Sequence, residues 1–147
     1  IGAFLGGATL TELRQSLLTA EAEITGIDLY MGSGGAPEGV LAAAALKCMG
    51  GQMWGRLLFR NDDERGRAAK AGITDLNRIY TRDEMVTADV IFSATGVTNG
   101  DMLRGVTYRP NGATTRSLVM RSKSGTVRRI EAVHKPAKLR GYSRIDL

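Results

Sequence analysis

The chain has 147 residues, of which 43% are hydrophobic, 24% charged and 5% aromatic, and its formal net charge at pH 7 is +5. This composition predicts one soluble globular domain, because the apolar content is too high for intrinsic disorder. The sequence also contains no run of 18 apolar residues, which is the length needed to span a membrane. The one cysteine, Cys48, excludes an intramolecular disulfide and a cysteine-based zinc site, and it favours a reducing, cytoplasmic location.

Residues 1–25 form an atypical N-terminal segment. They begin at Ile1 rather than at a methionine, and they lack the basic region of a signal peptide. We interpret this start as that of a fragment or of a processed chain. Regular structural signals run from Gly26 to residue 134, so we expect one folded unit over residues 26–134 and a surface tail over residues 135–147.

The first strand and helix are predicted on either side of a glycine loop. Residues 27–31 are typical of a short strand, and the glycine-rich residues 32–35 follow it. Pro37 suits the first helical turn, where its missing N–H leaves no bond unmade. An Ala-rich helix is expected over residues 40–49, and the glycines at 50–51 end it.

The next elements follow the same alternation. Residues 52–59 have an extended pattern, and Asn61 or Asp62 is suited to cap a helix that runs to about Ala71 and ends at Gly72.

A further short helix and a buried strand complete this part of the chain. Thr81 and Glu84 have the spacing of a capping box, which predicts a helix near Met85. Residues 89–95 have the pattern of a buried strand. The alternation of strands and helices through residue 95 predicts an α/β fold with a largely parallel sheet.

After residue 95 the pattern becomes that of an antiparallel meander. Extended runs cover residues 103–109, 113–121 and 126–133, and turn sequences separate them at residues 110–112 and 122–125. The Asn-Gly pair in the first turn is a hairpin signal, because both residues tolerate positive φ.

The glycine loop is the strongest candidate for a functional site. A strand, a glycine run and a helix N-terminus direct free backbone N–H groups toward one point, which is a geometry that binds phosphate oxygens. The spacing matches neither the P-loop motif nor the dinucleotide fingerprint. Glu38 follows in the first helical turn. Either it interacts favourably with the helix dipole, or it is a ligand for Mg²⁺ or Mn²⁺ beside a phosphate.

Two further loops carry groups suited to ligand binding. Thr95, Thr98 and Asp101 follow the strand at residues 89–95, and they either contact a ligand or form the turn. Arg121 and Lys123 lie in a serine-rich turn that either binds an anion or is a solvated basic hairpin.

The basic C-terminal part of the chain has several possible partners. Residues 104–147 carry eleven basic and two acidic side chains. This balance is compatible with a nucleic acid, with an anionic small ligand or with a solvated face. Tyr108 and Tyr142 are too few aromatics to stack the bases of a single strand, so we expect no nucleic acid partner.

The remaining reactive side chains are expected to be structural. His134 lacks a local Asp or Ser partner, which argues against a hydrolase triad and favours an ordinary strand-end histidine. Cys48 on the Ala-rich helix is expected in the core rather than as a nucleophile. Trp54 and the methionines are expected to pack in the interior.

Four ordered blocks, at residues 28–46, 55–65, 91–98 and 117–127, resemble the class II (GlpX-type) fructose-1,6-bisphosphatases. The first block reads DLYMGSGGAPEGVLAAAAL and the last SLVMRSKSGTV. The resemblance implies that residues 26–134 are the C-terminal domain of such an enzyme. The implied fold is that of the sugar phosphatases related to inositol monophosphatase, with a mixed sheet, flanking helices and a terminal antiparallel meander.

The resemblance also implies a chemistry. The family removes the 1-phosphate of fructose 1,6-bisphosphate with Mn²⁺ or Mg²⁺, in cytoplasmic carbohydrate metabolism such as gluconeogenesis. Glu38 matches the last metal-ligand glutamate, and Gly35 matches a substrate-contacting glycine, with Gly34 and Ser33 beside it.

Several family features are absent from this sequence. The upstream acidic metal ligands are missing, and no Asp-Gly-Asp substrate loop occurs near residues 11–13. Ser33 replaces an aliphatic residue, Arg116 a histidine and Asn99 an aspartate. One carboxylate holds a divalent cation poorly, so we expect the chain alone to be nearly inactive. The alternative is a non-catalytic module that binds phosphosugars or a partner, either a second copy of the chain or a polypeptide that supplies the missing half.

Overall fold

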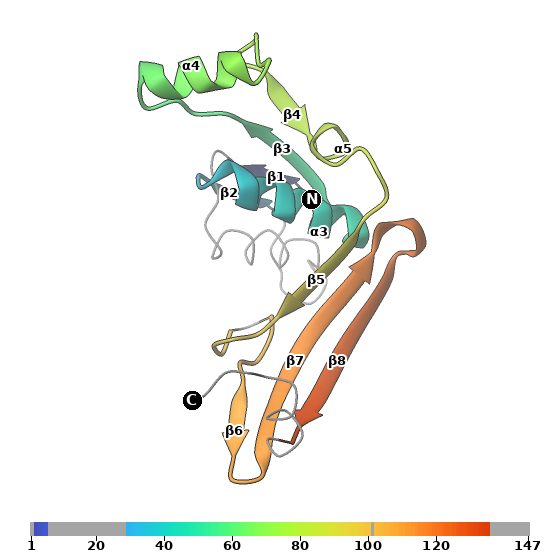
Figure 1. Cartoon of the computed structure of the whole chain (residues 1–147). Coiled ribbons are helices and arrows are strands. Elements are labelled where there is room, and N and C mark those ends of the chain that lie inside the picture. Colours follow the sequence, from blue (N-terminus) through green and yellow to red (C-terminus); the bar gives the residue numbers. More distant parts are fainter. Residues whose placement is uncertain (1, 6–28, 101, 136–147) are drawn as a thin grey trace.

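The computed structural model describes residues 2–5, 29–100 and 102–135 (Figure 1). Most of the segment at residues 1–25, Asp101 and all but the first residue of the expected tail at residues 135–147 therefore lie outside the described residues. Within the described part, no helix has both the length and the apolar character needed to cross a membrane.

The first sheet is mixed. Its strands are β1 (Gly2–Leu5), β2 (Leu29–Gly32), β3 (Gln52–Arg56) and β4 (Ile79–Thr81), in the order β2-β1-β3-β4. β1 pairs in parallel with β2 and β3, whereas β4 pairs antiparallel with β3. The described strand after the N-terminal segment thus begins at Leu29, because residues 27 and 28 are not described. β1, from the segment set apart as atypical, and β4 are strands that the sequence did not predict.

The predicted local signals shape the long helix α3 (Ala36–Met49). Pro37 lies in its first turn, and Gly50 ends it in the left-handed conformation with φ of 82°. A residue with a Cβ atom would be strained at that φ, whereas glycine is not. The glycine stop is confirmed, and the helix begins at Ala36 rather than at residue 40, because its first turn includes Pro37.

The two shorter helices are also capped as predicted. In α4 (Asp62–Lys70), the Asn61 side chain accepts a hydrogen bond from the Glu64 N–H. In α5 (Arg82–Met85), Thr81 and Glu84 form the complete capping box. These bonds satisfy backbone donors that have no partner within the first turn of a helix.

The second sheet is antiparallel. It contains β5 (Ile91–Thr95), β6 (Thr107–Arg109), β7 (Gly112–Arg121) and β8 (Thr126–His134), and β7 pairs with all three of the others. A 3-10 turn at Ser122–Ser124 joins β7 to β8. The expected meander is therefore confirmed, although within its first turn only Gly112 has a positive φ.

The structure corrects the expectation of a largely parallel sheet through residue 95. β5 does not join the parallel strands but pairs antiparallel with β7, so that Ile91 lies opposite Arg121. It is also covered on one side only: Phe92 is buried, whereas Ile91 is 70% exposed. A strand at the edge of an antiparallel sheet buries one face, and this accounts for its alternating burial.

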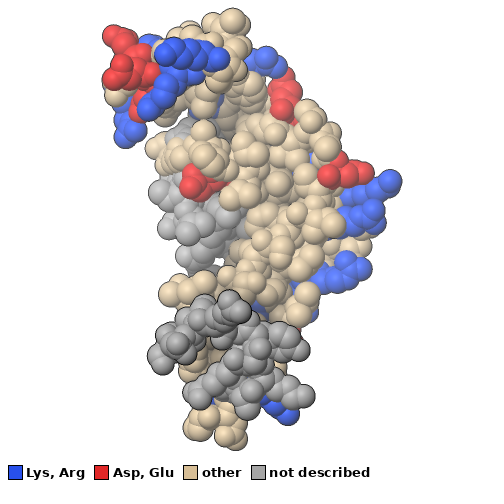
Figure 2. Space-filling view, in the orientation of Figure 1, with Lys and Arg blue, Asp and Glu red and all other residues tan. Residues whose placement is uncertain are grey.

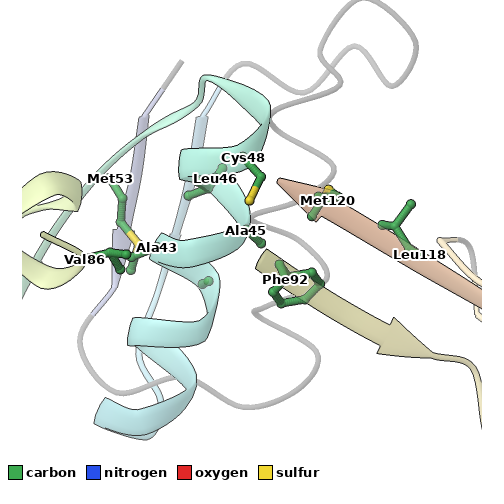
Figure 3. Packing of buried hydrophobic residues seen from close by; sticks show 10 residues of the cluster. Ala43, Ala45, Leu46, Cys48, Met53, Val86, Phe92, Leu118 and Met120 are labelled. Atoms are coloured by element: carbon green, nitrogen blue, oxygen red, sulfur yellow. The ribbon is translucent and has the colours of Figure 1, made fainter. Parts of the chain in front are cut away.

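Helix α3 packs between the two sheets (Figures 1 and 3). On one side Ala43 faces Met53 and Val86, and on the other side the helix meets Phe92 and Met120 (Figure 3). Alanine side chains let the sheets approach the helix closely, and fully burying a side chain such as Leu contributes about 1.5–3 kcal/mol. The buried cluster is Ala42, Ala43, Ala45, Leu46, Cys48, Met53, Val86, Phe92, Leu118 and Met120.

Trp54 and the methionines are only partly interior, contrary to expectation. Met53 and Met120 are buried, but Trp54 is 42% exposed and Met31 is 70% exposed. Met31 and Trp54 are aligned through β1, and they lie on the opposite face of the sheet from Met53, because side chains alternate along a strand. α3 packs against the Met53 face, so the other face keeps its apolar side chains exposed.

Candidate functional site

The loop that joins β2 to α3 carries the first amide groups of the helix, and Gly35 in it forms a β-bridge. Gly35 is the N-cap of α3, with φ of −70° and ψ of 139°, and as a glycine it makes no side-chain cap. The first N–H groups of a helix have no acceptor within the helix, and Pro37 has no N–H to offer. The N–H groups of Ala36 and Glu38 therefore have no acceptor within the helix, and they lie where the helix dipole attracts negative charge.

The same loop forms one wall of a large cavity. This cavity has a volume of about 1020 Å³ and lies among the start of α3, the end of β3, and α4, β4 and α5. Ser33, Gly34 and Gly35 all line it, so the three predicted substrate-binding residues are brought together. Its other lining residues are Ala36, Val40, Met53, Gly55, Arg56, Leu57, Leu58, Phe59, Arg60, Glu64, Arg67, Ile73, Tyr80, Glu84 and Met85.

Glu38 leaves the helix in a different direction. Ala36 and Val40 line the cavity, and residues four apart share one face of a helix. Glu38 is two positions from each of them, which is about 200° around the axis. It is half-buried and does not line the cavity. The predicted metal ligand and the predicted substrate loop are thus adjacent in the chain but lie on different sides of the start of α3.

The described residues do not make a complete metal site. Among them, no three His, Cys, Asp or Glu side chains lie close enough together to hold a metal ion. A divalent cation such as Mg²⁺ or Mn²⁺ needs several oxygen ligands, and the glycine loop offers the single carboxylate of Glu38. The donor set of this part of the chain therefore does not fit such a cation by itself.

Both carboxylates that line the cavity are paired with arginines. Glu64 accepts hydrogen bonds from the backbone N–H of Arg60 at 2.8 Å and from the Arg60 guanidinium at 2.8 and 3.1 Å. These bonds lower the pKa of Glu64. Glu84 accepts from the Thr81 N–H at 2.8 Å, from Arg78 at 2.9 Å and from the Thr81 hydroxyl, and its pKa falls to about 2. Both groups remain ionised at neutral pH.

Charged side chains concentrate around this end of the molecule. Figure 2 shows Lys, Arg, Asp and Glu side chains gathered over α4, at the end of the molecule away from β6. The arginines of the cavity wall, Arg56, Arg60 and Arg67, were not singled out by the sequence analysis. The signal that could have found Arg56 and Arg60 is their position at and just after the carboxyl end of β3, whereas Arg67 on α4 has no such local signal.

The loop after β5 is held by its own hydrogen bonds as a turn, and its residues do not line this cavity. Thr95 Oγ1 lies 2.8 Å from Ser117 Oγ, and the Asn99 side chain accepts a hydrogen bond from the Gly105 N–H at 3.0 Å. Thr98 is exposed, and Asp101 lies outside the described residues. Asn99 therefore has the turn-forming role that was one of the two alternatives for this loop.

Arg121 and Lys123 lie near the opposite end of α3. The Cys48 thiol in the last turn of that helix contacts the Val90 carbonyl at 3.9 Å, and Ser122 exchanges hydrogen bonds with Val90 at 2.9 and 3.0 Å. Helix α3 has 14 residues, so its two ends are about 21 Å apart. The structure does not bring these two basic residues to the glycine loop.

The remaining candidates are structural, as expected. Cys48 is buried, and its burial raises the pKa of the thiol, which opposes a nucleophilic role. His134 ends β8, and its Nε2 lies 2.8 Å from the hydroxyl of Thr115.

Comparison with known proteins identifies the family. The family model for the glpX-encoded bacterial fructose-1,6-bisphosphatase matches residues 11–134. The chain belongs to this family. The match includes residues 11–25, which the sequence analysis had set apart as atypical.

Named relatives of the glpX-type bisphosphatase family agree with this. The chain is 39% identical over 122 residues to the class 2 fructose-1,6-bisphosphatase of Haemophilus influenzae, an alignment that covers 74% of this chain and 36% of the relative. It is 38% identical over 130 residues to a D-fructose 1,6-bisphosphatase class 2/sedoheptulose 1,7-bisphosphatase of Synechococcus sp. (strain JA-3-3Ab), covering 80% and 38%. The chain thus spans rather more than a third of the length of these curated relatives.

Proposed function

We propose that this chain contributes the phosphate-binding part of a sugar phosphatase that converts fructose 1,6-bisphosphate and water to fructose 6-phosphate and phosphate. The observation that carries the proposal is the start of α3, where the first helical N–H groups, the cavity-lining Ser33–Gly35 and Glu38 occur within six residues. In this proposal, the sugar phosphate binds on the side of the helix start that faces the cavity, and the carboxylate of Glu38 acts on the other side. The membership in the bisphosphatase family supports the choice of substrate.

The proposal assigns a role to each residue of the loop. The N–H groups of Ala36 and Glu38 hold phosphate oxygens, which helix N-termini favour. Gly34 and Gly35 let the substrate approach the backbone, and Ser33 offers a hydroxyl beside them. Glu38 is one ligand of Mn²⁺ or Mg²⁺, and the other ligands come from outside the described residues.

The proposed architecture follows the same family. Residues 26–134 are the C-terminal domain of a sugar phosphatase of the inositol monophosphatase and fructose bisphosphatase type. Residues 1–25 and 135–147 flank it. We place this chain in cytoplasmic carbohydrate metabolism, including gluconeogenesis and glycerol metabolism.

Calorimetric titration tests the proposal directly. We expect the chain to bind fructose 1,6-bisphosphate in the presence of Mn²⁺, and Glu38→Gln to lose the part of the affinity that depends on the metal. Lys70→Ala, a distant exposed site, serves as control. Phosphate release by the chain alone should stay at background, because a single carboxylate holds the cation weakly. The absence of any binding by the folded chain would overturn the proposal, and turnover abolished by Glu38→Ala would overturn the expected inactivity.

A second function is a partner-binding module. The face of the first sheet that α3 does not cover carries the exposed side chains of Leu29, Met31, Trp54 and Ile79. Contiguous apolar surface of this kind favours association, either between copies of the chain or with a polypeptide that corresponds to the N-terminal half of such an enzyme. Sedimentation velocity measures association between copies of the chain. Association with a second polypeptide is tested by adding the N-terminal part of the Haemophilus influenzae relative and measuring whether phosphatase activity appears.

A further inference from the structure

The strand β8 forms one edge of the second sheet. It pairs with β7 over its whole length, from Thr126 opposite Arg121 to His134 opposite Ala113, and β7 is the only described strand that pairs with it. Figure 1 shows β8 as the outermost strand of this sheet, on the side away from β5. The outer side of β8 therefore presents a row of backbone N–H and C=O groups that no other described strand pairs with.

An edge of this kind is suited to pair with a further strand. β8 has nine residues, and neither a proline nor a short length protects it from pairing. Its exposed apolar side chains are those of Val127, Ile130 and Val133, which are 39%, 45% and 71% exposed. A paired strand would cover these side chains as well as the backbone edge.

The charges of β8 determine which strand can pair with it. Arg129 and Glu131 lie on the same face of the sheet, because they are two residues apart. If a second β8 runs antiparallel to the first with Ile130 opposite the partner's Ile130, Arg129 lies opposite the partner's Glu131. On the same face, Val127 then lies opposite the partner's Val133. The strand is therefore complementary to itself in charge and in apolar contact.

Like charges exclude the neighbouring registers. A shift that keeps the same faces together moves the pairing by two residues, because side chains alternate along a strand. Such a shift places Arg129 opposite the partner's Arg129 in one direction, and Glu131 opposite the partner's Glu131 in the other. Like charges directly opposite each other are destabilising. The register centred on Ile130 avoids both contacts.

The existing ion pair of Glu131 is compatible with this register. Glu131 Oε2 lies 2.8 Å from Nε of Arg116 on β7, and the Glu131 side chain is 57% exposed. A carboxylate accepts hydrogen bonds at both of its oxygens. Glu131 can therefore bond Arg116 on one side and the partner's Arg129 on the other, because β8 lies between β7 and the partner strand.

We propose that β8 is an interface between two copies of this chain, whose edge strands pair antiparallel around a two-fold axis at Ile130. The two four-stranded sheets then form one continuous sheet, and each β8 edge is covered. This interface is distinct from the apolar face of the first sheet. It contains none of the residues to which phosphosugar binding is assigned, so it does not depend on the proposed function.

Disulfide trapping tests the register. Residues directly opposite each other in antiparallel strands have Cα atoms about 4.5–5.5 Å apart, which a disulfide can span. We expect Ile130→Cys to form a linked dimer on oxidation with copper phenanthroline, seen by non-reducing electrophoresis. Ile91→Cys is the matched control, because Ile91 is 70% exposed on β5, which lies on the other side of β7, and it should stay monomeric. Cys48 is buried, so it should form no link of its own.

Sedimentation velocity of charge variants tests the pairing of Arg129 with Glu131. Arg129→Glu and Glu131→Arg each place like charges opposite each other, so each should raise the dimer dissociation constant at least tenfold. An equimolar mixture of the two variants should dimerise again, because one carries only acidic and the other only basic groups at these positions. Val133→Lys should also weaken the dimer, whereas Val97→Lys, at a side chain that is 78% exposed outside β8, should not.

Several outcomes would overturn the interface: a parent chain that stays monomeric, equal trapping of the two cysteine variants, or a dimer that no β8 variant weakens. A dimer that is weakened by Trp54→Ser alone would place the association on the first sheet instead. If Glu131→Arg fails to fold by circular dichroism because its bond to Arg116 is lost, Arg129→Glu and Val133→Lys are compared with the parent chain, with the same expected direction.

Discussion

A methyl group on Gly96 would collide with the carbonyl oxygen of Arg104. The loop after β5 folds back on itself at this point, and the Gly96 N–H also donates to the Arg116 carbonyl at 3.0 Å. Neither partner is the end of a flexible side chain, so neither can move away without breaking the turn. The loop that begins at the end of β5 is therefore fixed by backbone contacts that only glycine allows.

Gly96→Ala is expected to destabilise the chain by about 1–3 kcal/mol, because inserting a group into a packed site forces the backbone to shift. Gly66→Ala is the matched control. It lies in α4 with open space around its Cα, and it should stabilise the helix by about 0.5–1 kcal/mol. Urea unfolding followed by circular dichroism measures both. Equal effects of the two substitutions would contradict the close approach to Arg104.

Leu46→Ala should lower the free energy of unfolding by about 2–5 kcal/mol, since it opens a cavity where α3 meets both sheets. Leu41→Ala on the same helix removes the same atoms from a side chain that is 48% exposed. We expect a loss of less than about 1 kcal/mol there. Thermal and urea unfolding of both variants test which face of α3 is buried. A larger loss of unfolding free energy for Leu41→Ala than for Leu46→Ala would contradict the burial of the Leu46 face.

The capping box of α5 makes the stability depend on pH. The pKa of Glu84 is about 2 in the folded chain because the Thr81 N–H, Arg78 and the Thr81 hydroxyl all bond the carboxylate, and its ordinary value is 4.5. Its stabilising effect is therefore complete above pH 4.5 and is lost as the pH falls toward 2. We expect Glu84→Gln to lower the urea midpoint at pH 6 and to leave it unchanged near pH 2.

Thr81→Val separates the contribution of the Thr81 hydroxyl, which donates a hydrogen bond to Glu84, from that of the other donors. The Thr81 N–H and Arg78 still donate to Glu84 in this variant, so a part of the dependence on pH should remain. A midpoint difference between the parent chain and Glu84→Gln that stays constant from pH 6 to pH 2 would exclude the proposed origin.

Cys48 should react slowly with iodoacetamide in the folded chain. It is 3% exposed, and its burial raises the pKa of the thiol, so both access and the thiolate fraction are reduced. Mass spectrometry of the alkylated chain should show little modification in buffer and complete modification in denaturing urea. Equally fast alkylation under both conditions would show that the end of α3 is open.

Local signals in the sequence predicted the ends of the helices. Pro37, Asn61 and the Thr81–Glu84 pair act through bonds between residues a few positions apart, and Gly50 acts through its own φ. Such features need no distant partner, so they could be read from neighbouring residues alone. The glycine loop was found for the same reason.

The pairing of β5 required distant residues. The residues of β7 that pair with β5 lie 22 to 30 positions away in the chain, and an edge strand of an antiparallel sheet has a short apolar run like that of a parallel strand. The sequence pattern therefore allowed both arrangements, and it assigned β5 to the wrong sheet.

By itself, the sequence determined where α3 ends, that a glycine loop precedes it, and that the chain resembles a family of sugar phosphatases. The sequence could not determine which face of α3 is buried, because residues 40–46 are apolar on every side of the helix. Only packing against both sheets buried Ala42, Ala43 and Leu46 while leaving Val40 and Leu41 half-exposed. That rotation turns Ala36 and Val40 toward the cavity and Glu38 away from it, since the direction of a side chain on such a helix depends on its neighbours in space.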